Sequence, residues 1–302
     1  MVMKFAWKGQ TFITVKRRMV IMQNKILLLA ISFLLIFPVY DAAYAEEERE
    51  EYFSVGHDIQ LLPWMEADKI VPRYSKFSIL DIETGKLFHV QRRAGSQHAD
   101  VQPLTVKDTN ILKAIYQGKW SWKRRAIIVI ANGQWLAASM HGMPHGAGAL
   151  NNNFPGHFCV HFLGSTTHKS DKMDTSHMLM VYKAAGMLPD YLNHLEAKEV
   201  VVSFIAGLKE QDPFILKQLA TEKIDWKSEL TSVENIRLLE LKEIGSHAAD
   251  TIKDYSIEWQ LYLKNKKPLR ETKKITLIRS SQLEPWKVVV YPSYLQKAAK
   301  RK

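Results

Sequence analysis

Cys159, the only cysteine of this 302-residue chain, lies between two histidines. Residues 156–162 have the composition of a short β-strand, in which side chains two positions apart project from the same face. His157, Cys159 and His161 should therefore lie side by side. A cysteine nucleophile needs a neighbouring imidazole that takes its proton or stabilises the thiolate. The pattern predicts cysteine chemistry at Cys159, with a thiol pKa well below the free value of about 8.5.

Two further histidines, each followed by a glycine, precede this strand as His141-Gly142 and His145-Gly146. Imidazole is a poor core residue unless each nitrogen has a hydrogen-bond partner, so this density of histidines favours a functional site. Both histidines are candidates for the general base, and the tight turn around His145 favours that residue slightly. Gly142, Gly146 and Gly156 would allow backbone N–H groups to approach a substrate oxyanion.

This part of the chain resembles the catalytic domain of the L,D-transpeptidases. That family has a His-Gly pair, a spacer and then a Ser/Thr-His-Gly-Cys motif. Here His141-Gly142 begins the pattern, and Gly156-His157-Phe158-Cys159 ends it after a spacer of matching length. The resemblance covers roughly residues 76–165 and implies a mostly β fold. It also implies that Cys159 is the nucleophile, His141 the base and His157 an imidazole of the substrate site.

Three positions depart from the family motif. Gly156 replaces the Ser/Thr, Phe158 replaces the Gly, and His161 stands where an Arg or Asn is usual. If the family's glycine has a positive φ or permits close backbone approach, Phe158 would alter the oxyanion region. The resemblance implies that Cys159 attacks a peptide carbonyl in peptidoglycan stem peptides. An amine or water would then resolve the thioester, without a cofactor.

The same residues could instead bind zinc, because thiolate and imidazole are zinc ligands. His157, Cys159, His161 and His145 could form a tetrahedral shell. Adjacent residues on one face of a strand are about 7 Å apart, so three in a row would bind one ion only with strain. A zinc-dependent wall peptidase would also need a carboxylate base, for which Asp100 is the candidate. A third alternative is a non-catalytic protein that binds the cell wall.

Other candidate residues lie outside this cluster. His98-Ala99-Asp100 is expected in a loop, where Asp100 would orient a catalytic imidazole or cap the loop. Asn151-Asn152-Asn153 forms turns readily and is a candidate for a mobile lip of the site. Three tryptophans could stack on sugar rings or simply pack: Trp120, Trp122 and Trp135. Three histidines are expected on the surface or on helices: His168, His177 and His194.

Several β-strands and one long loop must position these residues. Residues 76–82 and 87–91 predict a hairpin, and Thr105 to Asp108 predicts a capping box that begins a helix. Asn132-Gly133 predicts a type I′ turn between strands at residues 126–131 and 134–140. Residues 141–156 form a loop rich in Gly, Asn and His that leads into the strand of Cys159. A helix is expected at residues 175–185.

A different pattern begins near residue 195. Helices are expected at residues 197–209 and from Asp212-Pro213, and the alternation from Tyr255 to Leu263 predicts a half-buried antiparallel strand. Its neighbours are expected at residues 275–279 and 286–291. Helices followed by a curved antiparallel sheet are similar to cystatin-like or nuclear-transport-factor-2-like folds. We therefore expect an α+β protein with a β-rich catalytic domain at residues 46–194 and a small α+β accessory domain at residues 195–302.

Residues 1–45 have the features of a secretory signal peptide. Basic residues precede a short apolar run, Ile26 to Phe37, and Ala43-Tyr44-Ala45 precedes an acidic segment. The apolar run is too short to span a bilayer, so no stable membrane span is expected after cleavage. A modest excess of basic residues suits an anionic wall. We expect a secreted or wall-associated protein whose partner is peptidoglycan or another wall polymer, not nucleic acid.

Overall fold

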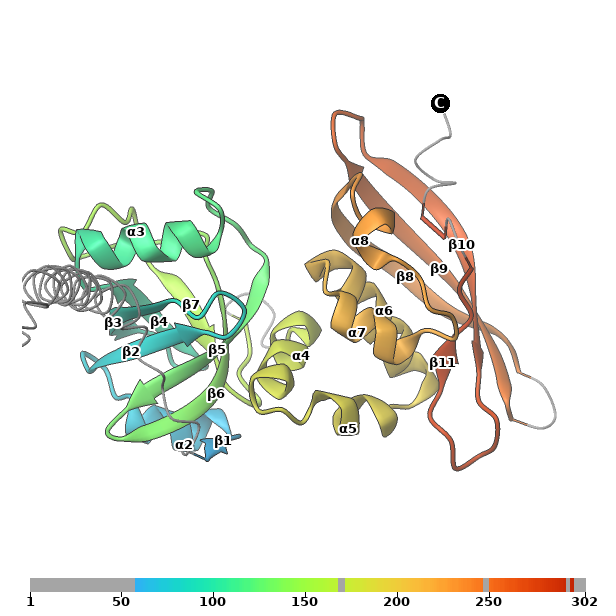
Figure 1. Cartoon of the computed structure of the whole chain (residues 1–302), viewed down its shortest axis with the longest axis horizontal. Coiled ribbons are helices and arrows are strands. Elements are labelled where there is room, and N and C mark those ends of the chain that lie inside the picture. The colour runs from blue at the N-terminus through green and yellow to red at the C-terminus, as the bar shows by residue number, and fades with distance from the viewer. Residues whose placement is uncertain (1–57, 168–171, 247–249, 292–293, 296–302) are drawn as a thin grey trace, which may run out of the picture. The chain divides into compact units, whose positions relative to one another are not determined.

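The computed structural model of the chain describes residues 58–167, 172–246, 250–291 and 294–295 (Figure 1). Strands and helices are mixed, with more residues in strands, so the predicted α+β class is confirmed. The signal peptide predicted at residues 1–45 lies outside the described residues. Within the described ranges, no helix is long and apolar enough to cross a membrane.

Six strands of the first half close into a barrel. They are β2 (Lys76–Asp81), β3 (Leu87–Ala94), β4 (Ala99–Pro103), β5 (Arg124–Ala131), β6 (Gln134–His141) and β7 (Phe158–His161). Their order is β6-β5-β2-β3-β4-β7, and antiparallel pairing of β7 with β6 closes the ring. The short strand β1 (Ile59–Gln60) adds to β6 in parallel. Closure pairs both edges of the sheet, which an open sheet would expose.

Alternation along the strands divides the barrel residues into an inner and an outer set. Phe158 and Val160 of β7 pack in the barrel core with apolar side chains of the other strands. Cys159 and His161, which alternate with them, therefore project from the outer face. The prediction that Cys159 and His161 share one face of a strand agrees with this arrangement.

The register of three neighbouring strands brings polar outer side chains together, because β7 lies between β4 and β6. Asp100 of β4 is directly opposite Cys159, and Ser139 of β6 is directly opposite His161. Residues directly opposite each other have Cβ atoms about 5 Å apart, so their side chains can contact each other. The candidate site is thus built on the outer face of β4, β7 and β6.

Two predicted local structures are confirmed in the barrel. The Thr105 hydroxyl accepts a hydrogen bond from the N–H of Asp108, and the Asp108 carboxylate accepts one from the N–H of Thr105. This capping box begins helix α3 (Val106–Ile115). Asn132 and Gly133 have φ angles of 50° and 73° between β5 and β6. Two positive φ angles are what a type I′ turn requires.

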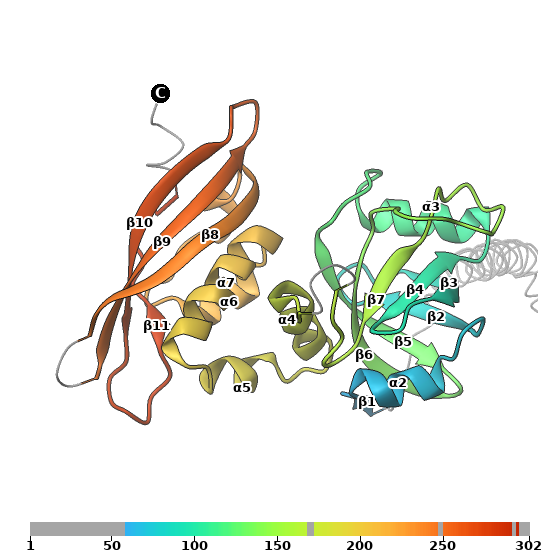
Figure 2. The same ribbon diagram turned by 180° about the vertical axis from the view of Figure 1, so that it is seen from behind.

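Further helices precede and follow the barrel strands along the chain (Figures 1 and 2). Helix α2 (Trp64–Ile70) precedes β2, and α4 (Thr175–Ala184), α5 (Leu188–Asn193), α6 (Ala197–Glu210), α7 (Pro213–Leu219) and α8 (Trp226–Glu229) follow β7. Helix α4 packs against β5 and β6. Leu179, Met180 and Ala184 of α4 belong to a hydrophobic cluster that includes Ala126, Ile128 and Ala137 of the barrel and Phe204 of α6.

A second, antiparallel sheet follows the helices in the order β11-β10-β9-β8. Its strands are β8 (Val233–Ser246), β9 (Ile252–Leu263), β10 (Leu269–Ile278) and β11 (Lys287–Val288). Along β9, buried residues from Tyr255 to Leu263 alternate with half-buried ones, which confirms the predicted half-buried strand. Helices α6, α7 and α8 lie beside this sheet (Figures 1 and 2), and α6 packs against β8 and β11.

Two elements differ from the sequence prediction. Ala99 and Asp100 are not in a loop, because they begin β4 and pair with β3 and β7. Strand β8 is absent from the prediction, because its second half has few apolar residues and is mostly exposed. The predicted domain boundary at residue 195 falls between α5 and α6, and the division into two domains stays a prediction.

Candidate active site

Cys159 and His145 form a close thiol–imidazole pair. Sγ of Cys159 lies 3.4 Å from Nε2 of His145. The other ring nitrogen, Nδ1, lies 3.2 Å from the carbonyl oxygen of Met143. Because a carbonyl oxygen can only accept, Nδ1 carries a hydrogen, and in the neutral ring Nε2 has a lone pair towards the sulfur. His145 is therefore placed to accept the thiol proton.

The second neighbour of the thiol is Asp100, which is buried on β4. Its Oδ1 lies 3.7 Å from Sγ, 3.2 Å from Nε2 of His98 and 3.7 Å from Nε2 of His157. His98 and His157 each donate Nδ1–H to a backbone carbonyl, that of Thr166 at 2.8 Å and that of Ala147 at 3.0 Å. These bonds turn both Nε2 atoms towards the carboxylate. A neutral ring that donates Nδ1–H has no hydrogen on Nε2, so only a ring with hydrogens on both nitrogens would donate to Asp100.

Burial raises the pKa of the Cys159 thiol well above its ordinary value, and the charge and hydrogen bond of Asp100 raise that pKa further. Arg124 acts in the opposite direction. The sequence prediction of a lowered thiol pKa is therefore wrong, because Cys159 is only 4 % exposed and lies beside an anion. The thiol is neutral at rest. Nucleophilic attack would require proton transfer to His145 during the reaction, not a preformed thiolate.

His141 lies beside this pair, with its ring centroid 5.2 Å from that of His145. Its Nδ1 accepts a hydrogen bond from the N–H of Met143 at 3.3 Å. Burial lowers the pKa of His141 well below its ordinary value, and the charge of Arg124 adds to this effect. The ring is thus neutral, and its hydrogen is on Nε2. One of its nitrogens lies within 4.8 Å of Sγ of Cys159.

Trp122 borders the site on its solvent side. Its ring centroid lies 4.7 Å from that of His141 and 5.4 Å from that of His145, and the residue is 49 % exposed. Trp120 instead packs edge-on against Phe154 at 5.2 Å. Trp122 is therefore the tryptophan best placed to contact a substrate.

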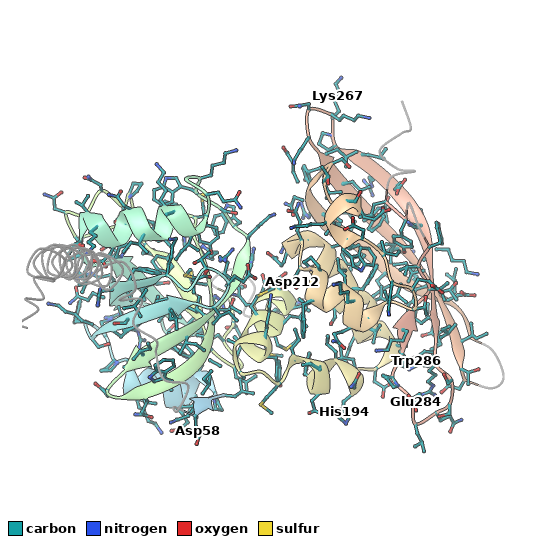
Figure 3. All side chains as sticks on the ribbon, viewed as in Figure 1. Asp58, His194, Asp212, Lys267, Glu284 and Trp286 are labelled. Atoms are coloured by element: carbon teal, nitrogen blue, oxygen red, sulfur yellow. The ribbon has the colours of Figure 1, made fainter. Side chains whose placement is uncertain are left out.

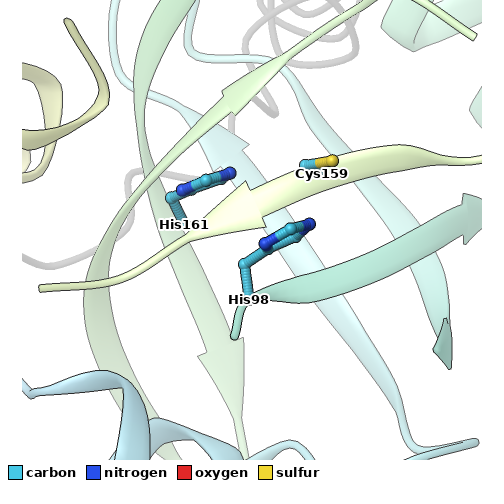
Figure 4. A group of neighbouring side chains, drawn as sticks. All are labelled: His98, Cys159 and His161. Atoms are coloured by element: carbon cyan, nitrogen blue, oxygen red, sulfur yellow. The ribbon is translucent and has the colours of Figure 1, made fainter. Parts of the chain in front are cut away.

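His98, His161 and His177 form a buried stack of rings. The ring centroids of His98 and His161 are 4.5 Å apart, and those of His161 and His177 are 3.8 Å apart, with each pair of planes within 10° of parallel. Figure 4 shows the first pair beside Cys159. Nδ1 of His177 lies 2.9 Å from Oγ of Ser139. Burial lowers the pKa of His177 well below its ordinary value, and the nearby His161 lowers it further.

The role of His177 in this stack is missing from the sequence prediction. His177 lies on helix α4 as predicted, but it is buried beside β6 and β7. Helical spacing could have predicted its burial, because His177 lies on the same face of α4 as the buried residues Met180, Val181 and Ala184. A polar ring on an apolar helix face needs a polar partner. His194, by contrast, is exposed at the end of α5 (Figure 3), and His168 lies outside the described residues.

Gly146 and Gly156 allow His145 and His157 to pair. The two histidines exchange backbone N–H to carbonyl hydrogen bonds of 2.9 Å in both directions. At Gly146, with φ of 60°, a Cβ would lie 2.3 Å from Cε1 of His157; at Gly156, with φ of 132°, it would lie 2.5 Å from the carbonyl oxygen of His145. These glycines therefore have a packing role. The oxyanion role expected for them stays a prediction.

The rest of the loop between β6 and β7 is anchored to the barrel. Gly142 packs against Tyr116, whose ring a Cβ would approach to 2.3 Å. Oε1 of Gln102 accepts a hydrogen bond from the N–H of Ala149 at 2.8 Å. Asn152 is fully buried, and its Oδ1 accepts a hydrogen bond from the N–H of Phe154 at 3.0 Å. Asn152 is therefore part of the packed structure and not of a mobile lip.

Among the residues that the structure describes, two groups of side chains have the composition and spacing of a metal site, and both include Cys159. One is His98, Cys159 and His161, and the other is His141, His145 and Cys159; within each group the ligand atoms lie within 4.8 Å of one another. The zinc ligands expected from the sequence are distributed between these two groups, except for His157. Nε2 of His157 is turned towards Asp100 instead.

No family model matches the chain, and no curated protein matches it either. The resemblance to the L,D-transpeptidases is therefore carried by the residues quoted above and stays a prediction. The geometry places a neutral thiol between a proton-accepting imidazole and a buried carboxylate. Such an arrangement can form a covalent bond to an electrophilic carbon, and it can also bind a thiophilic cation.

Proposed function

We propose that the protein is an exported cysteine acyltransferase or peptidase, similar to the L,D-transpeptidases, that acts on peptidoglycan stem peptides. The main support is the 3.4 Å separation between Sγ of Cys159 and Nε2 of His145, whose Nδ1–H is directed at Met143. An imidazole held in this tautomer is the proton acceptor that a neutral thiol needs. Of the two candidate bases, His145 is the one in direct contact with the sulfur.

The first half-reaction would couple proton transfer to bond formation. Nε2 of His145 takes the thiol proton while Sγ of Cys159 bonds to the carbonyl carbon of the donor peptide. The tetrahedral intermediate then collapses, the C–N bond breaks, and the leaving amine takes the proton from His145. A thioester and a free amine are the products.

The second half-reaction would reverse these roles. An amine acceptor or water attacks the thioester carbon and gives a proton to His145. The C–S bond breaks, and the proton returns to the sulfur, which regenerates the neutral thiol. Transfer to an amine forms a new peptide bond, and transfer to water gives hydrolysis.

His141 and Asp100 would assist in different ways. The neutral His141 ring carries its hydrogen on Nε2, because Nδ1 accepts a hydrogen bond from Met143, so this N–H would donate to the developing oxyanion. Asp100 lies on the opposite strand from Cys159, with His98 and His157 turned towards it. In the resting state Oδ1 of Asp100 accepts the Sγ–H of Cys159, so this hydrogen would first rotate towards Nε2 of His145, which takes it as the sulfur attacks.

The substrate would approach from the side of His145 and Trp122. Trp122 is half exposed and His145 is partly exposed, whereas Cys159, His98 and His161 are buried. The stem peptide would therefore pass over Trp122 before its carbonyl reaches the sulfur. The predicted signal peptide and the basic composition support a location at the wall.

The test is incubation of the protein with purified muropeptides that carry tetrapeptide stems, followed by mass spectrometry of the products. The proposal predicts product formation that a thiol reagent and Cys159→Ala abolish and that a metal chelator does not reduce. A zinc-dependent peptidase would give the opposite pattern, with loss on chelation. A non-catalytic wall-binding protein would sediment with wall fragments and give no product under either treatment.

A further inference from the structure

We infer that the centre also binds a thiophilic divalent cation such as Zn²⁺ through Cys159, His145 and His141, and that the bound ion blocks the nucleophile. This inference goes beyond the proposed acyl transfer and does not depend on it, because it rests on the donor atoms alone. The three ligand atoms lie within 4.8 Å of one another. Sulfur and imidazole nitrogen are preferred zinc ligands.

The separation of Sγ and Nε2 suits two ligands of one ion. Zinc–sulfur bonds are about 2.3 Å long and zinc–nitrogen bonds about 2.0–2.1 Å. With those bond lengths, the 3.4 Å between Cys159 Sγ and His145 Nε2 corresponds to an S–Zn–N angle of about 100°, close to tetrahedral. An ion can therefore take the place of the thiol proton with little movement of either side chain.

The ring of His145 is already oriented as in a zinc site. Metal-binding histidines usually donate the N–H that does not face the metal to a carboxylate or a backbone carbonyl. Here Nδ1–H of His145 donates to the carbonyl of Met143 at 3.2 Å. The ring plane of His141 is inclined by 44° to that of His145, so both planes can contain one ion. Binding through Nε2 of His141 would move the ring hydrogen to Nδ1 and replace the 3.3 Å hydrogen bond from the N–H of Met143.

The other group, His98, Cys159 and His161, suits a single ion less well. An imidazole nitrogen binds a metal in the plane of its ring. The rings of His98 and His161 are within 10° of parallel, with centroids 4.5 Å apart (Figure 4), so no point at bonding distance lies in both planes. His141 is as buried as His161, at 3 % exposed, so the difference in access lies in His145, which is partly exposed.

The local charge favours a divalent cation. The buried Asp100 carboxylate lies 3.7 Å from Sγ, so a free thiolate at Cys159 would be a second negative charge in the same place. A doubly charged cation balances both charges, and its binding releases the thiol proton to solvent. Asp100 therefore opposes a free thiolate but stabilises one that is bound to metal.

The test uses Co²⁺ as a spectroscopic probe and Zn²⁺ as its competitor on the wild-type protein. Stoichiometric cobalt should produce a thiolate-to-metal charge-transfer band and the visible bands of a tetrahedral ion, and Zn²⁺ should remove both. Zinc should also protect Cys159 from iodoacetamide. Cys159→Ala, which lacks the sole cysteine, is the control and should show no such band. Absence of the charge-transfer band in unmodified protein would overturn the inference.

Two variants separate the two groups of ligands. His141→Gln should weaken Zn²⁺ binding by at least about 10- to 100-fold, the effect of losing even the hydrogen-bond partner of a ligand. His161→Gln is the matched change in the group of His98, Cys159 and His161, and it should weaken Zn²⁺ binding much less. A larger loss of Zn²⁺ affinity in His161→Gln than in His141→Gln would overturn the inference. If circular dichroism shows that His141→Gln is unfolded, the wild-type cobalt spectrum and the zinc protection decide.

Acyl transfer provides an independent measurement. If the protein forms a thioester in the absence of metal but shows no charge-transfer band when cobalt is added, only the metal inference is contradicted. A protein that gives the cobalt band but processes no muropeptide contradicts only the proposed function. If the protein both binds zinc and processes muropeptides, Zn²⁺ should inhibit muropeptide turnover, and a chelator should restore that turnover.

Discussion

Acidification should destabilise the protein through two buried histidines, His141 and His177. Burial is the largest cause that lowers both pKa values well below the ordinary range, and each residue is 3 % exposed. In the unfolded chain both side chains titrate near pH ~6.5. Below that pH the unfolded state binds protons that the folded state does not bind. The free energy of unfolding therefore falls as the pH falls.

The size of the effect follows from proton linkage. Between pH 7.5 and pH 5.5, each histidine that stays neutral in the folded state lowers the free energy of unfolding by about 1.4 kcal/mol. His141 and His177 together should contribute about 2.7 kcal/mol. For a chain of this length, that corresponds to a fall in Tm of roughly 5–10 °C. Urea titrations and thermal melts at the two pH values, at constant ionic strength, measure it.

Other groups also titrate in this range, so the decisive quantity is a difference between variants. His177→Gln removes one titrating group and keeps an amide that can bond to Oγ of Ser139, which lies 2.9 Å from the present ring. Between pH 7.5 and pH 5.5, this variant should lose about 1.4 kcal/mol less of its free energy of unfolding than the wild-type protein loses. His194→Gln is the matched control, because the His194 side chain is 77 % exposed. Equal pH dependence in wild type and His177→Gln would refute the reasoning.

Three further substitutions test other contacts. His145→Gln should slow thioester formation by at least about 100-fold, the lower range for general-base catalysis; a folded variant with nearly wild-type rates would contradict that role. Gly146→Ala should lower the free energy of unfolding by more than about 1–2 kcal/mol, because φ is 60° and the added Cβ would lie 2.3 Å from His157; an unchanged urea midpoint would argue against it. Arg125→Met should cost about 3–5 kcal/mol in urea unfolding, because it leaves the buried Asp81 without the guanidinium that it bonds at 2.7 and 2.8 Å. Adding Asp81→Asn should recover part of that loss. A double variant that is as unstable as Arg125→Met alone would contradict this explanation.

The sequence predicts those elements that short-range chemistry determines. The turn at Asn132-Gly133 and the capping box from Thr105 to Asp108 depend on residues next to one another, and both occur in the structure. Closure of the barrel depends on the pairing of β6 with β7, and no local pattern encodes that contact. Strand β8 has few apolar residues in its second half, so its pairing with β9 determines its conformation.

The candidate site can be predicted in part for the same reason. Alternation places Cys159 and His161 on one face, and the density of histidines indicates a polar centre. The position of Asp100 opposite Cys159 depends on the register of β4 with β7, which lie far apart in the sequence. Burial raises the pKa of the thiol, and the anion that this register places beside the thiol raises that pKa further, opposite to the predicted direction. The contribution of His177 depends likewise on the packing of α4 against β6 and β7.

The proposed function requires that Cys159 becomes covalently acylated with the help of His145. The most direct measurement is the intact mass of protein quenched in acid during turnover of a tetrapeptide-stem muropeptide. The wild-type protein should gain a mass equal to the acyl part of the donor, located on the peptide that contains Cys159 and released by hydroxylamine. His145→Gln should carry little of this adduct and Cys159→Ala none. Turnover by Cys159→Ala at the wild-type rate, without any adduct in the wild-type protein, would contradict the proposed function.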